Sequence, residues 1–155
     1  MDLTARTIAF GALALGVFCS SGADAQKSLV NTWIDGWNSS TPQILVTDFT
    51  LDGYYEDVPS GLKKMGIKQI NDLHKYFHDV IGGLYIKLVA AHVGGHHGTI
   101  EWILSGTDVG MWKTGKPFSV QGVSVIEVKN GRISRDLDYY DMATVMKQLG
   151  VLPKQ

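Results

Sequence analysis

The segment GRISRDLDYYD, residues 131–141, has the composition of a β-strand and places two carboxylates and a phenol on a single face. Because successive side chains of a strand point to opposite faces, Ser134, Asp136, Asp138 and Tyr140 share this face. The opposite face is more apolar, so hydrophobic pattern alone would bury that one instead. Two interpretations follow: the polar face meets solvent and surface arginines, or it lines a pocket.

The chain has 155 residues, a formal net charge of −1 at pH 7 and one cysteine, Cys19. This length is typical of a single domain, and the even spread of charge argues against nucleic-acid or anionic-lipid partners, which require a basic patch. Cys19 falls in an N-terminal targeting segment, so we expect no disulfide and no thiolate nucleophile in the mature protein.

Residues 1–25 have the three parts of a secretory signal peptide. Arg6 forms a short basic region, residues 7–19 form an apolar run too short to span a bilayer comfortably, and the tripeptide ADA fits a cleavage site. We therefore predict cleavage after Ala25, one mature domain over residues 26–155, and a periplasmic or secreted protein without a membrane anchor. A buried N-terminal helix is the alternative interpretation.

Hydrophobic periodicity predicts an α+β fold with helices on one side of a curved antiparallel sheet. Helices are predicted over residues 27–39 and 67–81, with a short one from the Thr41 N-cap and Pro42 to about Thr47. Runs rich in β-branched and aromatic residues predict strands over residues 49–58, 84–93, 98–106, 117–128 and 132–140.

The connections carry their own signals. We expect a loop over residues 58–66. Asn130-Gly131 predicts a type I′ hairpin turn. Asp141 is placed to N-cap a last helix over residues 142–149, which Gly150 would end.

This order of elements, together with four phrases, resembles the SnoaL-like branch of the nuclear-transport-factor-two-like superfamily. The phrases are YYEDVPSG (54–61), SGTDVG (105–110), GKPFSVQGVSVIEVKNGRI (115–133) and DYYDMATVMKQLG (138–150). The resemblance implies a cone in which a curved sheet wraps the long helices around a deep, largely apolar pocket. It also implies that positions 136, 138 and 140 look into the cone, whereas Ile133 and the other odd-numbered positions look outward.

Ketosteroid isomerase has a related fold and keeps its general base in a V-E-D-P phrase. The similar run Tyr55-Glu56-Asp57-Val58-Pro59 implies that Asp57 is the base here. The oxyanion donors of that enzyme correspond to Trp33 and to Val120 or Gln121, so this oxyanion hole is absent or rebuilt.

Two other families on the fold point to the last strand. The R-D-Y-F-D phrase of limonene-epoxide hydrolase implies a role for Asp138 in activating water, although the hydrolase's R-x-D strand is not found in residues 98–106. SnoaL-type cyclases carry an acid-base aspartate that corresponds to Asp136, and their partner histidine falls near Gly122. Two carboxyls in an apolar cavity would raise each other's pKa, as acid-base chemistry at neutral pH requires.

Further candidates are aromatic side chains and histidines. His74 and His78 have the i, i+4 spacing of a metal pair, but no carboxylate completes a motif, so we expect no metal and no cofactor. The preferred interpretation places these histidines at the pocket mouth or on the solvent face. For the pocket mouth we choose His78. Tyr54 and Tyr55 alternate, so only one faces inward; the expected ligand contacts are Trp33, Tyr55, Trp102, Trp112 and His78.

We therefore expect an exported protein that binds a small hydrophobic molecule. If it is catalytic, the reaction is a proton-transfer isomerisation or an aldol-type cyclisation, with Asp57 and Asp136 or Asp138 as base and acid. Tyr140, or the phenol of Tyr54 or Tyr55, would polarise a carbonyl. The alternatives are a non-catalytic ligand-binding protein and a dimeric interaction module that pairs through the outer face of the sheet, and a homodimer is expected in any case.

Overall fold

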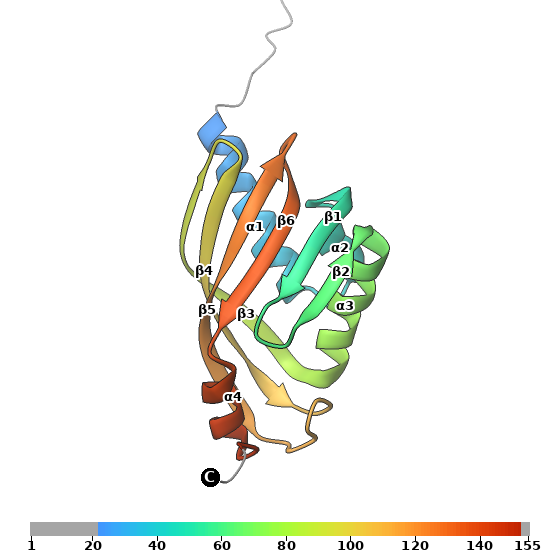
Figure 1. The fold of residues 1–155 in the computed structure, drawn as a ribbon, viewed down its shortest axis with the longest axis vertical. Helices are drawn as coiled ribbons and strands as arrows, with labels where there is room; N and C mark the ends of the chain where they lie inside the picture. The colour runs from blue at the N-terminus through green and yellow to red at the C-terminus, as the bar shows by residue number, and fades with distance from the viewer. Residues whose placement is uncertain (1–21, 153–155) are drawn as a thin grey trace, which may run out of the picture.

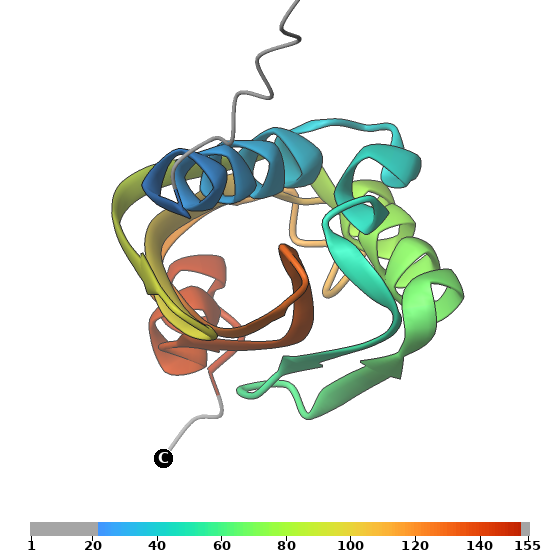
Figure 2. The same ribbon diagram turned by 90° about the horizontal axis from the view of Figure 1, so that it is seen from above.

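The computed structural model describes residues 22–152, and these form an α+β fold in which a curved, unclosed sheet of six strands wraps around helices (Figures 1 and 2). The strand order is β2-β1-β6-β5-β4-β3. Neighbouring strands pair antiparallel as predicted, except that β1 and β6 pair in parallel, so the sheet is mixed rather than fully antiparallel. The elements in chain order are α1 (Gly22–Asn38), α2 (Pro42–Val46), β1 (Phe49–Asp57), β2 (Leu62–Met65), α3 (Gly66–Val80), β3 (Ile81–Gly94), β4 (His97–Asp108), β5 (Pro117–Lys129), β6 (Arg132–Tyr140) and α4 (Met142–Leu149).

Two helices close the open side of the curved sheet. Helix α1 packs against β3 at one edge, and α3 packs against β1 near the other edge. Figure 2 shows both helices lying across the concave side, so the core forms between them and the sheet. No helix within residues 22–152 is long and apolar enough to cross a membrane.

Several local predictions are confirmed. Asn130 and Gly131 have φ of 53° and 73°, as a type I′ turn requires. The Asp141 carboxylate accepts a hydrogen bond from the Thr144 backbone N–H, and Gly150 ends α4 with φ of 74°. Thr41 does occupy the N-cap of α2, but its side chain makes no capping hydrogen bond.

The loop predicted over residues 58–66 is wrong in its second half, because residues 62–65 form strand β2. This strand pairs antiparallel with β1, and Leu62 lies opposite Asp57. It was missed because it is only four residues long and carries Lys63 and Lys64, a composition typical of a protected sheet edge.

Ile133 is a further correction, because it is fully buried in the core rather than pointing outward. One step along β5, from Glu127 to Val128, matches two steps along β6, from Arg135 to Ile133. The extra residue, Ser134, makes a β-bulge, which reverses the alternation of side chains on its N-terminal side.

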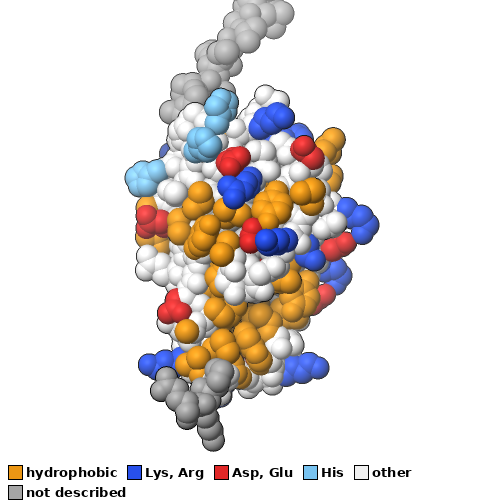
Figure 3. All heavy atoms as spheres, in the orientation of Figure 1, with side chains coloured by type: hydrophobic (Ala, Val, Ile, Leu, Met, Phe, Trp, Pro, Cys, Tyr) orange, Lys and Arg blue, Asp and Glu red, His pale blue; other side chains and the backbone are white. Residues whose placement is uncertain are grey.

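The outer face of β5 and β6 carries exposed apolar side chains among charged ones (Figure 3). Val125 is 38% exposed and Tyr139 is 42% exposed. Both alternate with buried neighbours, Ser124 and Asp138, so they point away from the core. Residues 1–21, most of the predicted signal peptide, lie outside the described part of the chain, and the boundary at Ala25 stays a prediction.

Candidate active-site pocket

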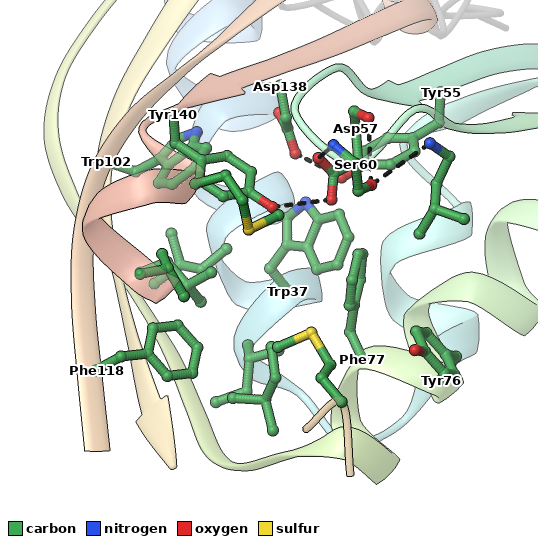
Figure 4. A pocket seen from close by; sticks show the side chains of 18 of the residues that line it. Trp37, Tyr55, Asp57, Ser60, Tyr76, Phe77, Trp102, Phe118, Asp138 and Tyr140 are labelled. Carbon is green, nitrogen blue, oxygen red and sulfur yellow. Dashed lines mark hydrogen bonds between the residues drawn. The ribbon is translucent and has the colours of Figure 1, made fainter. Parts of the chain in front are cut away.

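A cavity of about 440 Å³ opens between the concave face of the sheet, α1, α3 and α4 (Figure 4). Most of its wall is apolar, formed by Trp37, Leu62, Tyr76, Phe77, Ile81, Leu84, Ile86, Trp102, Leu104, Met111, Trp112, Phe118, Met142 and Val145. The rest of the wall is polar, formed by Tyr55, Asp57, Ser60, Asp138 and Tyr140. An apolar cavity with a few convergent polar groups is the usual form of a small-molecule site.

The polar groups meet because β1 and β6 pair in parallel. This pairing sets Asp57 opposite Asp138, so each strand presents an aspartate and a tyrosine two residues apart on its inner face. Each tyrosine donates to the aspartate of the other strand: Tyr55 Oη lies 2.6 Å from Asp138 Oδ2, and Tyr140 Oη lies 3.1 Å from Asp57 Oδ2. We call these two hydrogen bonds the crossed pairs.

Asp138 is the more tightly held carboxyl of the crossed pairs. Its second oxygen, Oδ1, accepts a hydrogen bond from the Ser124 hydroxyl, whose Oγ in turn accepts from Trp102 Nε1 at 2.9 Å. Burial raises the pKa of Asp138 to about 7, partly opposed by the hydrogen bonds from Ser124 and Tyr55. A carboxyl with this pKa exchanges its proton readily near neutral pH.

Asp57 is held more loosely. Its Oδ1 accepts from the Ser60 N–H at 3.3 Å, and its bond from Tyr140 is longer than the usual O–H···O distance of about 2.7–2.8 Å. Burial raises the pKa of Asp57 above its ordinary value, against the lowering effect of the Ser60 and Tyr140 hydrogen bonds. Asp57 is therefore the carboxylate that a bound molecule can engage with the least competition.

Asp136 lies behind the cavity wall, although it shares the inner face with Asp138. It is fully buried, and its Oδ2 accepts a hydrogen bond from Trp33 Nε1 at 3.0 Å. Burial and the neighbouring Asp138 charge hold the pKa of Asp136 well above its usual range. Among the inward positions of β6, exposure rises from Asp136 through Asp138 to the half-buried Tyr140, and only the last two line the cavity.

The family model described as SnoaL-like polyketide cyclase matches residues 27–149. The chain belongs to this family. A search of curated protein sequences found no match.

Solved structures share the fold of this SnoaL-like protein. A hypothetical protein from Catenulispora acidiphila with a ketosteroid isomerase-like fold, solved in complex with trimethylamine, is 28% identical, has a TM-score of 0.74, and covers 79% of this chain and 92% of its own. TsrD from Streptomyces laurentii is 18% identical, with a TM-score of 0.76 and coverage of 86% and 100%. An LEH-like epoxide hydrolase from M. tuberculosis is 17% identical, with a TM-score of 0.67 and coverage of 81% and 90%.

Of the ligand contacts expected from the sequence, Tyr55, Trp102 and Trp112 do line the cavity of the SnoaL-like protein. Trp33 and His78 do not. Trp33 is fully buried against Asp136, and His78 Nε2 bonds to the Trp37 backbone oxygen at 3.0 Å.

His74 is also placed differently from the expectation of a pocket-mouth or surface position, because it is fully buried. Its Nε2 bonds to the Gly36 carbonyl at 3.0 Å, and burial lowers its pKa to about 4. Within residues 22–152, no group of three or more His, Cys, Asp or Glu side chains is arranged to hold a metal ion.

Sequence reasoning missed Trp37, Ser60 and Ser124. The resemblance directed attention to Trp33, and Trp37, four residues further along the same helix face, is not among the expected ligand contacts. The four-residue spacing from Trp33 was the missed signal for Trp37. In a helix that crosses a cone, a side chain one turn further along the same face contacts the cavity at a later point. Ser124 carried no signal of its own, because its contact with Asp138 depends on the bulge at Ser134.

Gly122, where the cyclases' partner histidine would fall, lies under the ring of Trp102. A Cβ at this position would overlap the indole six-membered ring, with Cζ2 at only 2.7 Å. We expect Gly122→Ala to lower the free energy of unfolding by about 1–3 kcal/mol, because the indole, bonded to Ser124, cannot move aside freely. Gly94→Ala is the matched control, since a Cβ there meets nothing within 4 Å. Equal urea midpoints for the two variants would contradict this account.

Proposed function

We propose that this SnoaL-like protein binds a small, largely apolar carbonyl compound and moves a proton at the carbon next to the carbonyl. The supporting observation is the placement of two buried carboxyls, held by the crossed pairs, at one end of an otherwise apolar cavity. Asp57 serves as the base and Asp138 as the acid.

The roles follow from the different surroundings of the two carboxyls. Burial makes Asp57 a stronger base than an ordinary aspartate, so it can take a proton from an activated C–H group. The resulting enolate oxygen is stabilised by hydrogen-bond donors at the same end of the cavity. Asp57 returns the proton to a different carbon in an isomerisation. In an aldol-type cyclisation, the enolate carbon attacks a second carbonyl and the new alkoxide takes a proton from Asp138.

Proton exchange tests this proposal without knowledge of the natural substrate. Aryl and cyclic ketones with acidic α-protons are incubated with the protein in deuterium oxide, and the loss of each α-proton signal is followed by NMR. We expect exchange above the buffer rate for the members of the panel that bind. Binding of several ketones with no exchange above buffer would contradict a catalytic function.

The second candidate function is non-catalytic binding of a hydrophobic ligand. The observation that favours it is that both oxygens of Asp138 already accept hydrogen bonds, from Tyr55 and Ser124, which also suits a purely structural network. Under this alternative, ketones or other apolar molecules bind in the cavity and are released unchanged.

Export is proposed on the N-terminal sequence. Helix α1 begins at Gly22, so cleavage after Ala25 removes four residues from its start. We expect the mature protein, recovered from its host, to begin at Gln26 and to be found in the periplasm or the medium. N-terminal sequencing of the host-derived protein checks this, and an intact Met1 terminus in the cytoplasm would contradict it.

A homodimer is proposed through the outer face of β5 and β6, where Val125 and Tyr139 are exposed. Contact between two copies would remove this apolar surface from water. We expect the wild type to sediment as a dimer and Tyr139→Glu to sediment as a monomer. A monomeric wild type at all concentrations tested would rule this interface out.

A further inference from the structure

The indole nitrogen of Trp37 has no hydrogen-bond partner, although it is buried. The other two fully packed tryptophans each have one: Trp33 Nε1 donates to Asp136, and Trp102 Nε1 donates to Ser124. A buried N–H group left unpaired is costly, and such groups are rare enough in folded proteins to require an explanation.

Trp37 is also the unpaired group that belongs to the cavity. Five buried side-chain atoms within residues 22–152 lack a partner, and of their residues Trp37 alone forms part of the cavity wall. Figure 4 shows its indole among the side chains that line the cavity, with the nitrogen on the side of the ring nearer Tyr140 and Asp57 in this view. An N–H group can only donate, so its missing partner is an acceptor.

The position of Trp37 is fixed before any ligand binds. It lies near the C-terminal end of α1, where backbone carbonyls lack partners within the helix. His78 Nε2 bonds to the Trp37 carbonyl and His74 Nε2 bonds to the Gly36 carbonyl, each at 3.0 Å. A carbonyl only accepts, so both nitrogens carry the hydrogen. The two histidines thereby attach this end of α1 to α3, and the donor is preorganised.

We propose that the Trp37 indole N–H donates a hydrogen bond to an oxygen of the bound molecule. This inference rests on the proposed function because it concerns the same pocket. It narrows the class of ligand that the pocket binds. The ligand has a flat apolar body that carries a carbonyl, enolate or phenol oxygen at the end that meets Asp57 and Tyr140.

The looser of the two crossed pairs offers a way for the oxygen to reach the nitrogen. Because the nitrogen is covered in the structure, a neighbouring side chain must shift first. The 3.1 Å bond between Tyr140 and Asp57 is the longer of the crossed pairs and the easier one to open. Once released from Asp57, the Tyr140 hydroxyl becomes a second donor to the same oxygen.

An unpaired donor of this kind selects between ligands of equal shape. A ligand that lacks the oxygen fills the cavity but leaves the N–H unpaired, whereas a ligand with the oxygen satisfies it. The pair 2-naphthol and 2-methylnaphthalene tests this difference, because the two molecules have nearly the same size and differ in one hydroxyl group.

The first experiment is an NMR titration of the wild type that follows the indole N–H signals. We expect the chemical shift of the Trp37 indole N–H to move downfield when 2-naphthol binds. With 2-methylnaphthalene it should stay in the range of an N–H group that makes no hydrogen bond. The titration needs no variant, so it decides the question even if substitutions at Trp37 unfold the protein. An unmoved Trp37 signal at saturation, or no binding of either naphthalene at millimolar concentration, would overturn the proposal.

The second experiment measures dissociation constants by calorimetry. We expect Trp37→Phe to weaken 2-naphthol binding by about tenfold, the loss of one hydrogen bond, and to change 2-methylnaphthalene binding by less than about twofold. Trp112→Phe is the control, because Trp112 also lines the cavity but should affect both molecules alike. Equal weakening of both molecules by Trp37→Phe would show that the ring only packs.

The two proposals fail separately. A Trp37 signal that responds to 2-naphthol in a protein without ketone exchange supports this inference and removes the catalytic function. Ketone exchange with an unresponsive Trp37 signal does the reverse.

Discussion

Asp57→Asn is expected to lower the rate of ketone α-proton exchange by about 10²–10⁴-fold, the usual contribution of a general base. The amide has nearly the same shape as the carboxylate but cannot accept a proton at neutral pH. Its oxygen can still accept the Tyr140 hydrogen bond, so the crossed pair and the fold are kept. The measurement is the exchange rate of the fastest ketone in the panel, with circular dichroism to confirm folding.

Glu56→Gln is the matched control for this substitution. It makes the same chemical change one residue earlier, on the outward face of β1, where Glu56 bonds to Tyr54 at 2.6 Å. We expect it to leave exchange unchanged. An active Asp57→Asn variant would instead assign the base to Asp138, and loss of exchange in Asp138→Asn would then identify it.

The second large effect is on stability: Asp138→Asn is expected to become progressively more stable than the wild type between about pH 4 and pH 7. The Asp138 carboxyl has an ordinary pKa near 3.8 when unfolded and about 7 in the folded protein. The folded state therefore binds more protons in this interval, so its stability falls as the pH rises. The difference between variant and wild type should grow by up to about 1.4 kcal/mol per pH unit and level off above pH 7.

Comparison with the variant removes the effect of His74. Its pKa is lowered from 6.5 to about 4, so the folded state binds fewer protons in that interval and stability rises with pH. This opposes the Asp138 effect in the wild type but is the same in both proteins. Asparagine resembles a protonated aspartate in being neutral and in having a donor group on one side and an acceptor oxygen on the other, so the two proteins should be similar near pH 4.

Urea denaturation at each pH measures these differences. Asp79→Asn is the control for the amide substitution itself, because it makes the same change at an exposed ion pair with Lys75, outside the cavity wall. Parallel curves for wild type and Asp138→Asn would mean that Asp138 titrates normally in the folded protein, and the acid-base assignment would then be wrong.

The elements predicted well were those whose signals are local. Helical spacing of apolar residues found α1 and α3, and turn chemistry at Asn130-Gly131 found the last hairpin, because each signal lies within the segment that it shapes. The fold class followed from the order of these elements and from the resemblance.

The candidate site was predicted only in part, because contacts between distant strands decide it. No local signal shows that β1 lies beside β6, which is what brings Asp57 to Asp138. The hairpin turn alone would pair Ser124 with Leu137, and the bulge at Ser134 moves this contact to Asp138. Similarly, Asp136 and Asp138 share the inner face of β6, but only Asp138 lines the cavity. Which of the two reaches the cavity depends on how the sheet curves.

The crossed pairs also determine at which stage of folding the carboxyl groups acquire their raised pKa values. Each joins residues 83 positions apart, at nearly opposite ends of the sheet-forming sequence. Contacts this distant in sequence are slow to form, since a long loop must close before they contribute. During synthesis, Asp57 emerges long before β6 exists, and until then its carboxyl remains hydrated with ordinary acidity. We therefore expect the perturbed acidity to arise late in folding, when the last strand docks.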